Sequence, residues 1–190
     1  WSNIYLGINA ANLAILNIPN IDMNEDVKEN LLGEAYFMRG LLYFELVRFF
    51  GDVPLQLEPT TIFESSAYLP RSSRADVYTQ IFLDLGSAET SLPDIQVGED
   101  NGRPTSYSAK AYIAKAALQQ GGSENYQLAK TKLEEIGVQP GDQFDLWDDF
   151  GDVFLIPNNN GKEVLFAISF FEGPDVFSTL WEGGHLVFRT

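Results

Sequence analysis

One long segment of the sequence, residues 31–50, is apolar around most of a helical surface. A helix at a protein surface keeps its apolar side chains in one stripe, whereas a helix that is apolar all round is buried. The apolar residues of this segment are Leu31, Leu32, Ala35, Tyr36, Met38, Leu41, Leu42, Phe44, Leu46 and Phe49. Gly51 then suits the position after a helix C-terminus, and Pro54 prevents continuation. We therefore expect a central helix that is covered on several sides.

The few polar positions of this segment carry further information. Its charges are Glu34, Arg39, Glu45 and Arg48, and we expect them to form internal pairs or contacts to carbonyl groups rather than to bind a ligand. These charges also interrupt the most apolar stretch of the chain, so the sequence offers no run of 18 apolar residues for a membrane span. Gly40 costs about 1 kcal/mol relative to Ala inside a helix, which indicates that another backbone approaches closely there.

Helix start and stop signals predict four more helices. Apolar residues at steps of three and four, beginning at Trp1, predict a first helix that ends at residues 17–20, where Pro19 lies. Ser72 or Ser73 should cap the helix that follows the central one, and Asp76 in its first turn should complete a reciprocal capping interaction. Further helices should begin after Thr105 or Ser106 and over residues 124–136, closed by Gly121-Gly122 and Gly137. Short neighbouring helices favour antiparallel pairs.

The sequence changes character after Gly137. Residues 163–170 are rich in β-branched and aromatic residues and predict a short strand, preceded by a turn at 158–161. We therefore expect one domain over residues 1–190, with helical hairpins over 1–137 and loops with a short strand over 138–190.

Composition excludes several functions. The net charge is −15, with only 12 Lys and Arg residues, whereas phosphate binding needs clustered basic side chains. We therefore expect no nucleic-acid partner. The chain has no Cys, which excludes disulfides and thiolate metal sites. We expect no cofactor and no metal.

No convincing catalytic set is present. A Ser–His–Asp triad would have to use the single histidine, His185, and no nucleophile-elbow motif accompanies it. An acidic cluster around Trp147 could be a calcium loop or a catalytic pair, but EF-hand spacing is absent and we favour a solvated loop. Its carboxylates are Asp142, Asp145, Asp148, Asp149 and Asp152, and the residues expected to point inward are Phe144, Leu146, Trp147 and Phe150. We expect no enzyme.

Aromatic residues in loops are the better candidates for binding. Sugar rings have apolar C–H faces that stack on aromatic side chains, while most aromatics here lie at helical spacing and belong to the core. The candidate ligand-binding residues are Tyr68, Phe177, Trp181 and His185.

Three segments together resemble the SusD/RagB family. Residues 33–55, GEAYFMRGLLYFELVRFFGDVPL, closely match the signature helix of that family, with Gly40 in place of the usual Ala. Pro70-Arg71 and the following helix, then Gly102-Arg103-Pro104-Thr105 and the Ala-rich helix, match in order and separation. Residues 160–166, NGKEVLF, are similar to a strand of the family.

This resemblance implies a fold, a function and a location. The fold would be mostly α, a solenoid of stacked tetratricopeptide-like helical hairpins with a short β segment near the C-terminal end. The function would be cell-surface binding of glycans or peptides at the outer membrane of a Bacteroidetes-type bacterium, with a lipid anchor and a SusC-like TonB-dependent transporter as partner. Family members are far longer, and both ends of this chain look cut, so we expect an internal fragment.

A second hypothesis needs no small ligand. Stacked helical hairpins present surfaces that often hold peptides, so the chain could instead be a helical-repeat module for protein interaction.

Overall fold

The computed structural model of the 190-residue chain describes residues 1–60, 69–96, 102–137, 144–155, 158 and 161–168. It contains two compact units. The first comprises residues 1–95 and 104–137, and the second comprises residues 96–103 and 138–190. The two units are described separately below.

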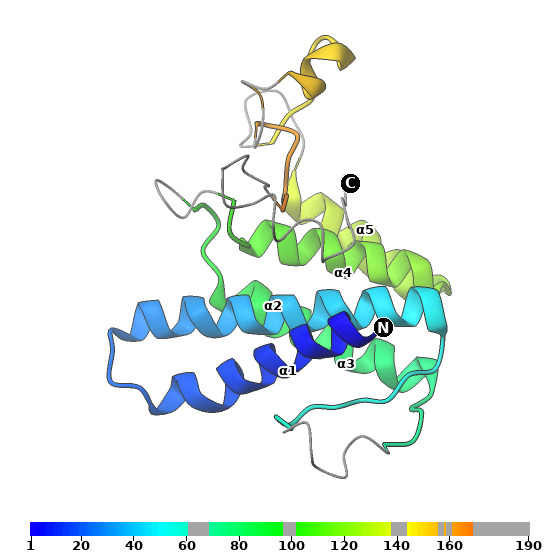
Figure 1. The fold of residues 1–190 in the computed structure, drawn as a ribbon. Coiled ribbons are helices and arrows are strands. Elements are labelled where there is room, and N and C mark those ends of the chain that lie inside the picture. Colours follow the sequence, from blue (N-terminus) through cyan, green and yellow to red (C-terminus); the bar gives the residue numbers. More distant parts are fainter. Residues whose placement is uncertain (61–68, 97–101, 138–143, 156–157, 159–160, 169–190) are drawn as a thin grey trace, which may run out of the picture. The chain divides into compact units, whose positions relative to one another are not determined.

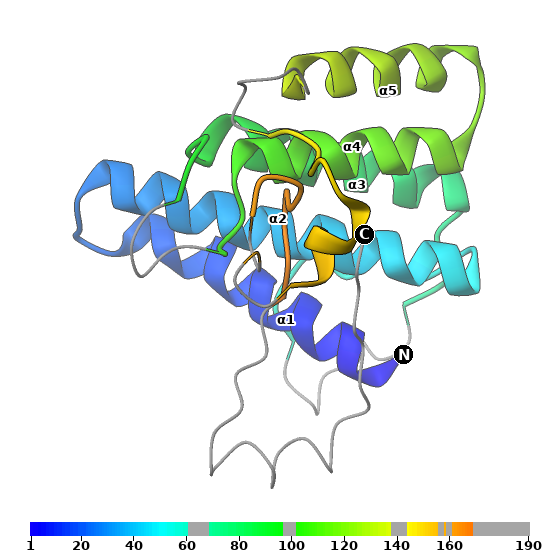
Figure 2. The same cartoon turned by 90° about the horizontal axis from the view of Figure 1, so that it is seen from above.

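The first unit is a stack of helices in chain order. Its α-helices among the described residues are α1 (Ser2–Asn17), α2 (Glu25–Phe50), α3 (Arg74–Ser91), α4 (Ser106–Gln120) and α5 (Ser123–Ile136), with a 3-10 turn η1 (Ile18–Asn20) after α1. Each helix packs against the next and runs in the opposite direction (Figures 1 and 2). A mostly α-helical chain with antiparallel neighbours is confirmed, while the likeness to tetratricopeptide units stays a prediction.

Local capping by side chains explains where α2, α3 and α4 begin. The Asn24 side chain accepts hydrogen bonds from the first backbone N–H groups of α2. At α3, Ser73 rather than Ser72 is the cap, and its hydroxyl donates to Asp76 at 2.6 Å. Thr105 caps α4 and forms a reciprocal pair with Ser108. The caps of α3 and α4 lie beside their helices in the sequence, which is why those two starts were predicted, whereas the Asn24 cap of α2 was not.

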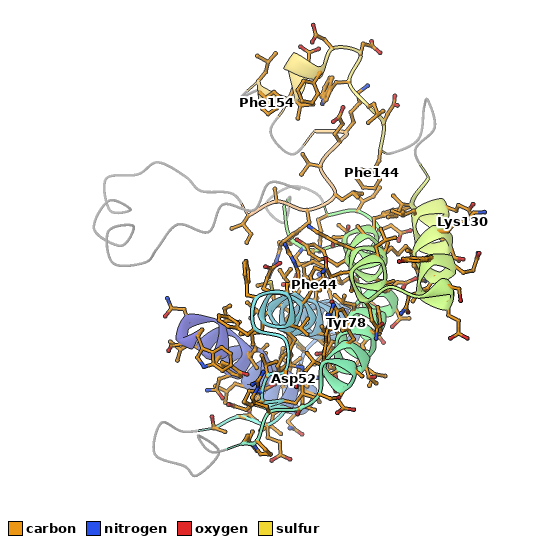
Figure 3. All side chains as sticks on the ribbon, turned by 90° about the vertical axis from the view of Figure 1, so that its right-hand side faces the viewer. Phe44, Asp52, Tyr78, Lys130, Phe144 and Phe154 are labelled. Atoms are coloured by element: carbon orange, nitrogen blue, oxygen red, sulfur yellow. The ribbon has the colours of Figure 1, made fainter. Side chains whose placement is uncertain are left out.

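The α2 helix is the buried centre of the first unit, as predicted. It packs against α1 on one side and α3 on another, and it also touches α4. Phe37, Tyr43, Phe44 and Leu46 on this helix are at most 1% exposed. Figure 3 shows Phe44 and Tyr78 among the packed helices, whereas Lys130 projects from the outer side of α5. Gly51 ends α2 with φ of +69°, a conformation that favours glycine.

Gly40 marks a close approach of α3 to α2. A Cβ at this position would lie 3.0 Å from Leu85 Cγ and 3.3 Å from Asp84 Cβ. The prediction of a close approach is therefore correct, but the nearest atoms belong to α3 side chains and not to its backbone. Close contact here brings α3 near enough for its polar residues to reach α2.

A buried ion pair joins α2 to α3 beside Gly40. The guanidinium of Arg39 donates from Nε and Nη2 to the two carboxylate oxygens of Asp84, at 2.8 and 2.7 Å. Arg39 Nη1 also donates to Asn12 Oδ1 on α1, and Gln80 donates to Asp84. Burial raises the pKa of Asp84, and the hydrogen bonds and charge of Arg39 oppose that rise. The internal pairing predicted for the charges of α2 is confirmed for Arg39, and also for Arg48, which pairs with Glu45.

The second unit is built from turns. Its one regular element among the described residues is the 3-10 helix η4 (Phe150–Phe154). Residues 163–168 of the predicted strand form no strand, and residues 169 and 170 lie outside the described residues. A strand needs a ladder of hydrogen bonds to a partner, whereas the backbone bond from the Asp145 N–H to the Lys162 carbonyl is not continued into a ladder along the described residues. The assignment of residues 1–190 to a single domain stays a prediction.

The pair of Arg39 and Asp84 generates a stability prediction. Replacing Asp84 by Asn leaves the buried guanidinium without a counter-charge, which should lower the free energy of unfolding by about 3–5 kcal/mol. Chemical denaturation monitored by circular dichroism measures this loss. The control is Asp76→Asn, which changes a carboxylate at the exposed start of the same helix. Equal losses in the two variants would contradict the role of the buried pair.

Candidate ligand-binding surface

The predicted binding residues lie in parts of the chain that the structure does not describe. Tyr68, Phe177, Trp181 and His185 all lie outside the described residues. Their role as ligand contacts therefore stays a prediction. The structure does show how the chain is held just before Tyr68, in the connecting segment of residues 53–60.

Side chains of α1 bind the backbone of the connecting segment. Asn9 accepts a hydrogen bond from the Thr60 N–H at 2.8 Å and donates to the Thr60 carbonyl at 3.1 Å. Asn12 donates to the carbonyls of Gln56 and Glu58 at 2.9 and 3.2 Å. An amide side chain has both a donor and an acceptor, so it can pair with an extended backbone as another strand would. These two asparagines hold the segment against α1.

Two tyrosines complete this network. The Tyr5 hydroxyl donates to the Pro54 carbonyl at 2.8 Å. The Tyr43 hydroxyl donates to the Gln56 carbonyl at 2.8 Å and accepts from the Gln56 N–H at 2.7 Å. Burial raises the pKa of Tyr5 to about 12, and burial also raises the pKa of Tyr43. Both hydroxyls therefore stay protonated and act as fixed donors at neutral pH.

This network positions the chain and does no chemistry of its own. Its side chains bond to backbone groups of the connecting segment, and its tyrosines are held in the protonated form. Because Asn9 binds both backbone groups of Thr60, the chain is fixed at the last described residue before the segment that contains Tyr68. Sequence reasoning missed this network, although asparagines on a helix face without charges were an available signal.

Exposed aromatic rings gather where α2 ends. Phe49 is 63% exposed, and Phe50 meets Trp1 edge to face with ring centroids 4.9 Å apart. Arg48 lies over the Phe49 ring at 5.8 Å. Exposed rings beside a cation can stack on apolar ligand faces. Sequence reasoning assigned these rings to helix packing and did not select them as binding residues.

Carboxylates of the acidic cluster in the second unit interact with groups within the same unit. Asp149 accepts from the Gly151 N–H at 2.7 Å and so begins η4, and Asp145 pairs with Lys162. The expectation that Leu146 and Phe150 point inward is wrong, because these side chains are 66% and 77% exposed. None of the described residues of this unit is buried, so the described part of the unit has no apolar core into which Leu146 and Phe150 could point.

Among the described residues, no group of three or more His, Asp or Glu side chains could hold a metal ion. None of the helices there is long and apolar enough to cross a membrane.

The family model that matches this chain covers residues 1–118, which include α1, α2, α3 and nearly all of α4. It describes SusD-like proteins, starch-binding and associating with the outer membrane. The chain belongs to the SusD-like family. The signature helix recognised in the sequence is α2, the buried centre of the first unit.

Relatives and solved structures agree with this assignment. The SusD-like protein P2 of Formosa agariphila is 32% identical over 90% of this chain and 33% of its own length. A structure of a laminarin-binding SusD-like protein is 33% identical, with a TM-score of 0.79 over 87% of this chain and 36% of that protein. A structure solved with a xylogluco-oligosaccharide is 28% identical, with a TM-score of 0.77 over 88% and 34%. This SusD-like chain spans about a third of the length of these relatives.

The tyrosines around the connecting segment generate a prediction for alkaline pH. Tyr5 keeps its proton up to about pH 12 in the folded state, whereas an unfolded tyrosine loses it near pH 10. Because the unfolded state then binds fewer protons than the folded state, stability should fall as the pH rises above about 10. Absorbance titration of the tyrosine phenolates should show that Tyr5→Phe has one fewer tyrosine that ionises only well above pH 10. An unchanged titration in Tyr5→Phe would contradict the raised pKa of Tyr5.

Proposed function

We propose that this SusD-like chain is part of a cell-surface protein that binds oligosaccharides and does not transform them. The observation that carries the proposal is the fold shared with solved relatives whose names include laminarin binding and a bound xylogluco-oligosaccharide. The acidic side chains that could have served catalysis are used elsewhere, since Asp149 begins η4 and Asp145 pairs with Lys162.

The proposed contacts are the loop aromatics Tyr68, Phe177 and Trp181, with His185 as a polar group. Aromatic rings would stack on the C–H faces of sugar rings, and polar side chains would bond to the hydroxyls. The network of Asn9, Asn12 and the tyrosines supports this arrangement because it fixes the backbone entering the segment that contains Tyr68.

The proposed partner is a SusC-like TonB-dependent transporter in the outer membrane. The proposed location is the cell surface, with a lipid anchor as membrane attachment. The family description, associating with the outer membrane, supports this location. Affinity capture from detergent-solubilised envelopes should recover a large β-barrel transporter, and capture of soluble proteins alone would count against this partner.

Isothermal titration calorimetry tests the ligand class. We expect the chain to bind laminarin or xyloglucan oligosaccharides, with heat signals that fit a saturable site. A panel of peptides serves as the comparison, since a peptide ligand is the other possibility within the family resemblance. Saturable binding of peptides with no response to any oligosaccharide would favour the helical-repeat interaction module instead.

Substitution of single aromatics tests the proposed contacts. Tyr68→Ala and Trp181→Ala should each weaken oligosaccharide binding by about 1–3 kcal/mol, by analogy with stacking of nucleic-acid bases on aromatic side chains. Tyr126→Ala is the matched control, because Tyr126 is an exposed tyrosine on α5 that the proposal does not use. Unchanged affinity in both loop variants would remove these residues from the site and leave the ligand class standing.

A further inference from the structure

One buried amide on α1 takes part in two separate sets of hydrogen bonds. Asn12 is 1% exposed, and its side chain has one acceptor oxygen and a nitrogen with two N–H groups. The oxygen accepts from Arg39 Nη1 at 3.0 Å, and the nitrogen donates to the carbonyls of Gln56 and Glu58 at 2.9 and 3.2 Å. The oxygen thus faces α2, while the nitrogen faces the connecting segment.

The bond from Arg39 determines which way this amide faces. A hydrogen bond from a charged donor is stronger than one between neutral groups, and Arg39 is itself held by two bonds to Asp84. If the guanidinium moved away, the buried oxygen of Asn12 would be left without its donor, which costs free energy unless the amide rotates or shifts. Either movement weakens the bonds from Asn12 to the two carbonyls.

Other anchors of the connecting segment do not depend on the ion pair. Asn9 binds both backbone groups of Thr60, and Tyr5 donates to the Pro54 carbonyl. Within the part of the chain that the structure describes, neither side chain bonds to Arg39. The two ends of the segment are therefore held independently, and only its middle is connected to the ion pair through Asn12.

We infer that Asn12 couples the order of residues 56–58 to the pair of Arg39 and Asp84. Packing of α3 on α2 holds Arg39, Arg39 orients Asn12, and Asn12 holds the two carbonyls of the segment. The middle of the connecting segment is thus fully held only when α3 is packed on α2, although α3 follows the segment in the sequence. This coupling needs no ligand, so its test is separate from that of the proposed function.

Hydrogen exchange of single backbone amides tests the coupling. Arg39→Lys keeps a positive charge for Asp84 but lacks the planar fork that also reaches Asn12. The Gln56 amide should exchange about tenfold faster in Arg39→Lys and in Asn12→Ala, which corresponds to the loss of about one hydrogen bond. Because both changes act through the same side chain, the double variant should exchange no faster than Asn12→Ala alone.

The Thr60 amide is the internal control for this experiment, since it bonds to Asn9 and should keep the exchange rate of the parent in all three variants. An unchanged Gln56 amide in Arg39→Lys would overturn the inference. Equal acceleration of Gln56 and Thr60 would also overturn it, because the effect would then be a general loosening of the chain. Additive effects in the double variant would show that Arg39 acts on the segment without Asn12.

Asn12→Asp separates the two sets of bonds without removing the ion pair. The carboxylate can still accept from Arg39, whose charge keeps it ionised at neutral pH, but it cannot donate to the carbonyls. We expect faster exchange at Gln56, while the amide of Leu85, a residue buried in α3, exchanges as in the parent. An exchange rate at Gln56 equal to that of the parent would contradict the inference.

A spin label at position 58 gives a second readout. Among the described residues, Asn12 alone bonds to the Glu58 backbone, and Glu58→Cys can be labelled specifically because the chain has no Cys. Electron paramagnetic resonance should show a more mobile label when Asn12→Asp or Arg39→Lys is added. A label at Leu118→Cys on α4, where Leu118 is 53% exposed, is the control. Equal gains in mobility at both positions would count against the coupling.

Discussion

One polar interaction constrains how the core around α2 can pack, the pair of Arg39 and Asp84. A guanidinium inside a helical core is tolerated only where its charge and its N–H groups are matched. Asp84 supplies both carboxylate oxygens to Arg39, and Asn12 takes a further N–H. The contact needs α3 to lie close against α2, and Gly40 permits that approach. The Arg39 side chain thus links α2 to both α1 and α3.

The asparagines of α1 extend this arrangement to the chain that follows α2. Asn12 bonds both to Arg39 and to carbonyls of the connecting segment, so the buried ion pair and that segment share one side chain. Asn9 and Tyr5 hold the segment at Thr60 and Pro54. Side chains of α1 therefore bind the backbone of the connecting segment, and α1 itself contains no charged side chain.

The family signature corresponds to the buried helix of the scaffold and not to residues that contact a ligand. Residues 33–55 contain most of α2 and the glycine that ends it, and the most deeply buried side chains of α2 lie in this part of the helix. A scaffold of this kind can serve different ligands, because the loops that contact a ligand can change while the buried helix does not. This explains why the signature identified the family from sequence and left the ligand to be proposed from loop aromatics. The candidate residues Tyr68, Phe177, Trp181 and His185 rest on composition and loop position alone.

The sequence by itself determined the helices and the family, because these depend on neighbours in the chain. The cap of Ser73 with Asp76, the end of α2 at Gly51 and the apolar surface of residues 31–50 are all local patterns. Only the tertiary structure decided which residue neutralises Arg39, which side chains hold residues 53–60, and that Leu146 and Phe150 face solvent. Those outcomes join residues such as Arg39 and Asp84, which lie 45 positions apart. No local pattern specifies such a partner, since it follows from how closely the helices pack.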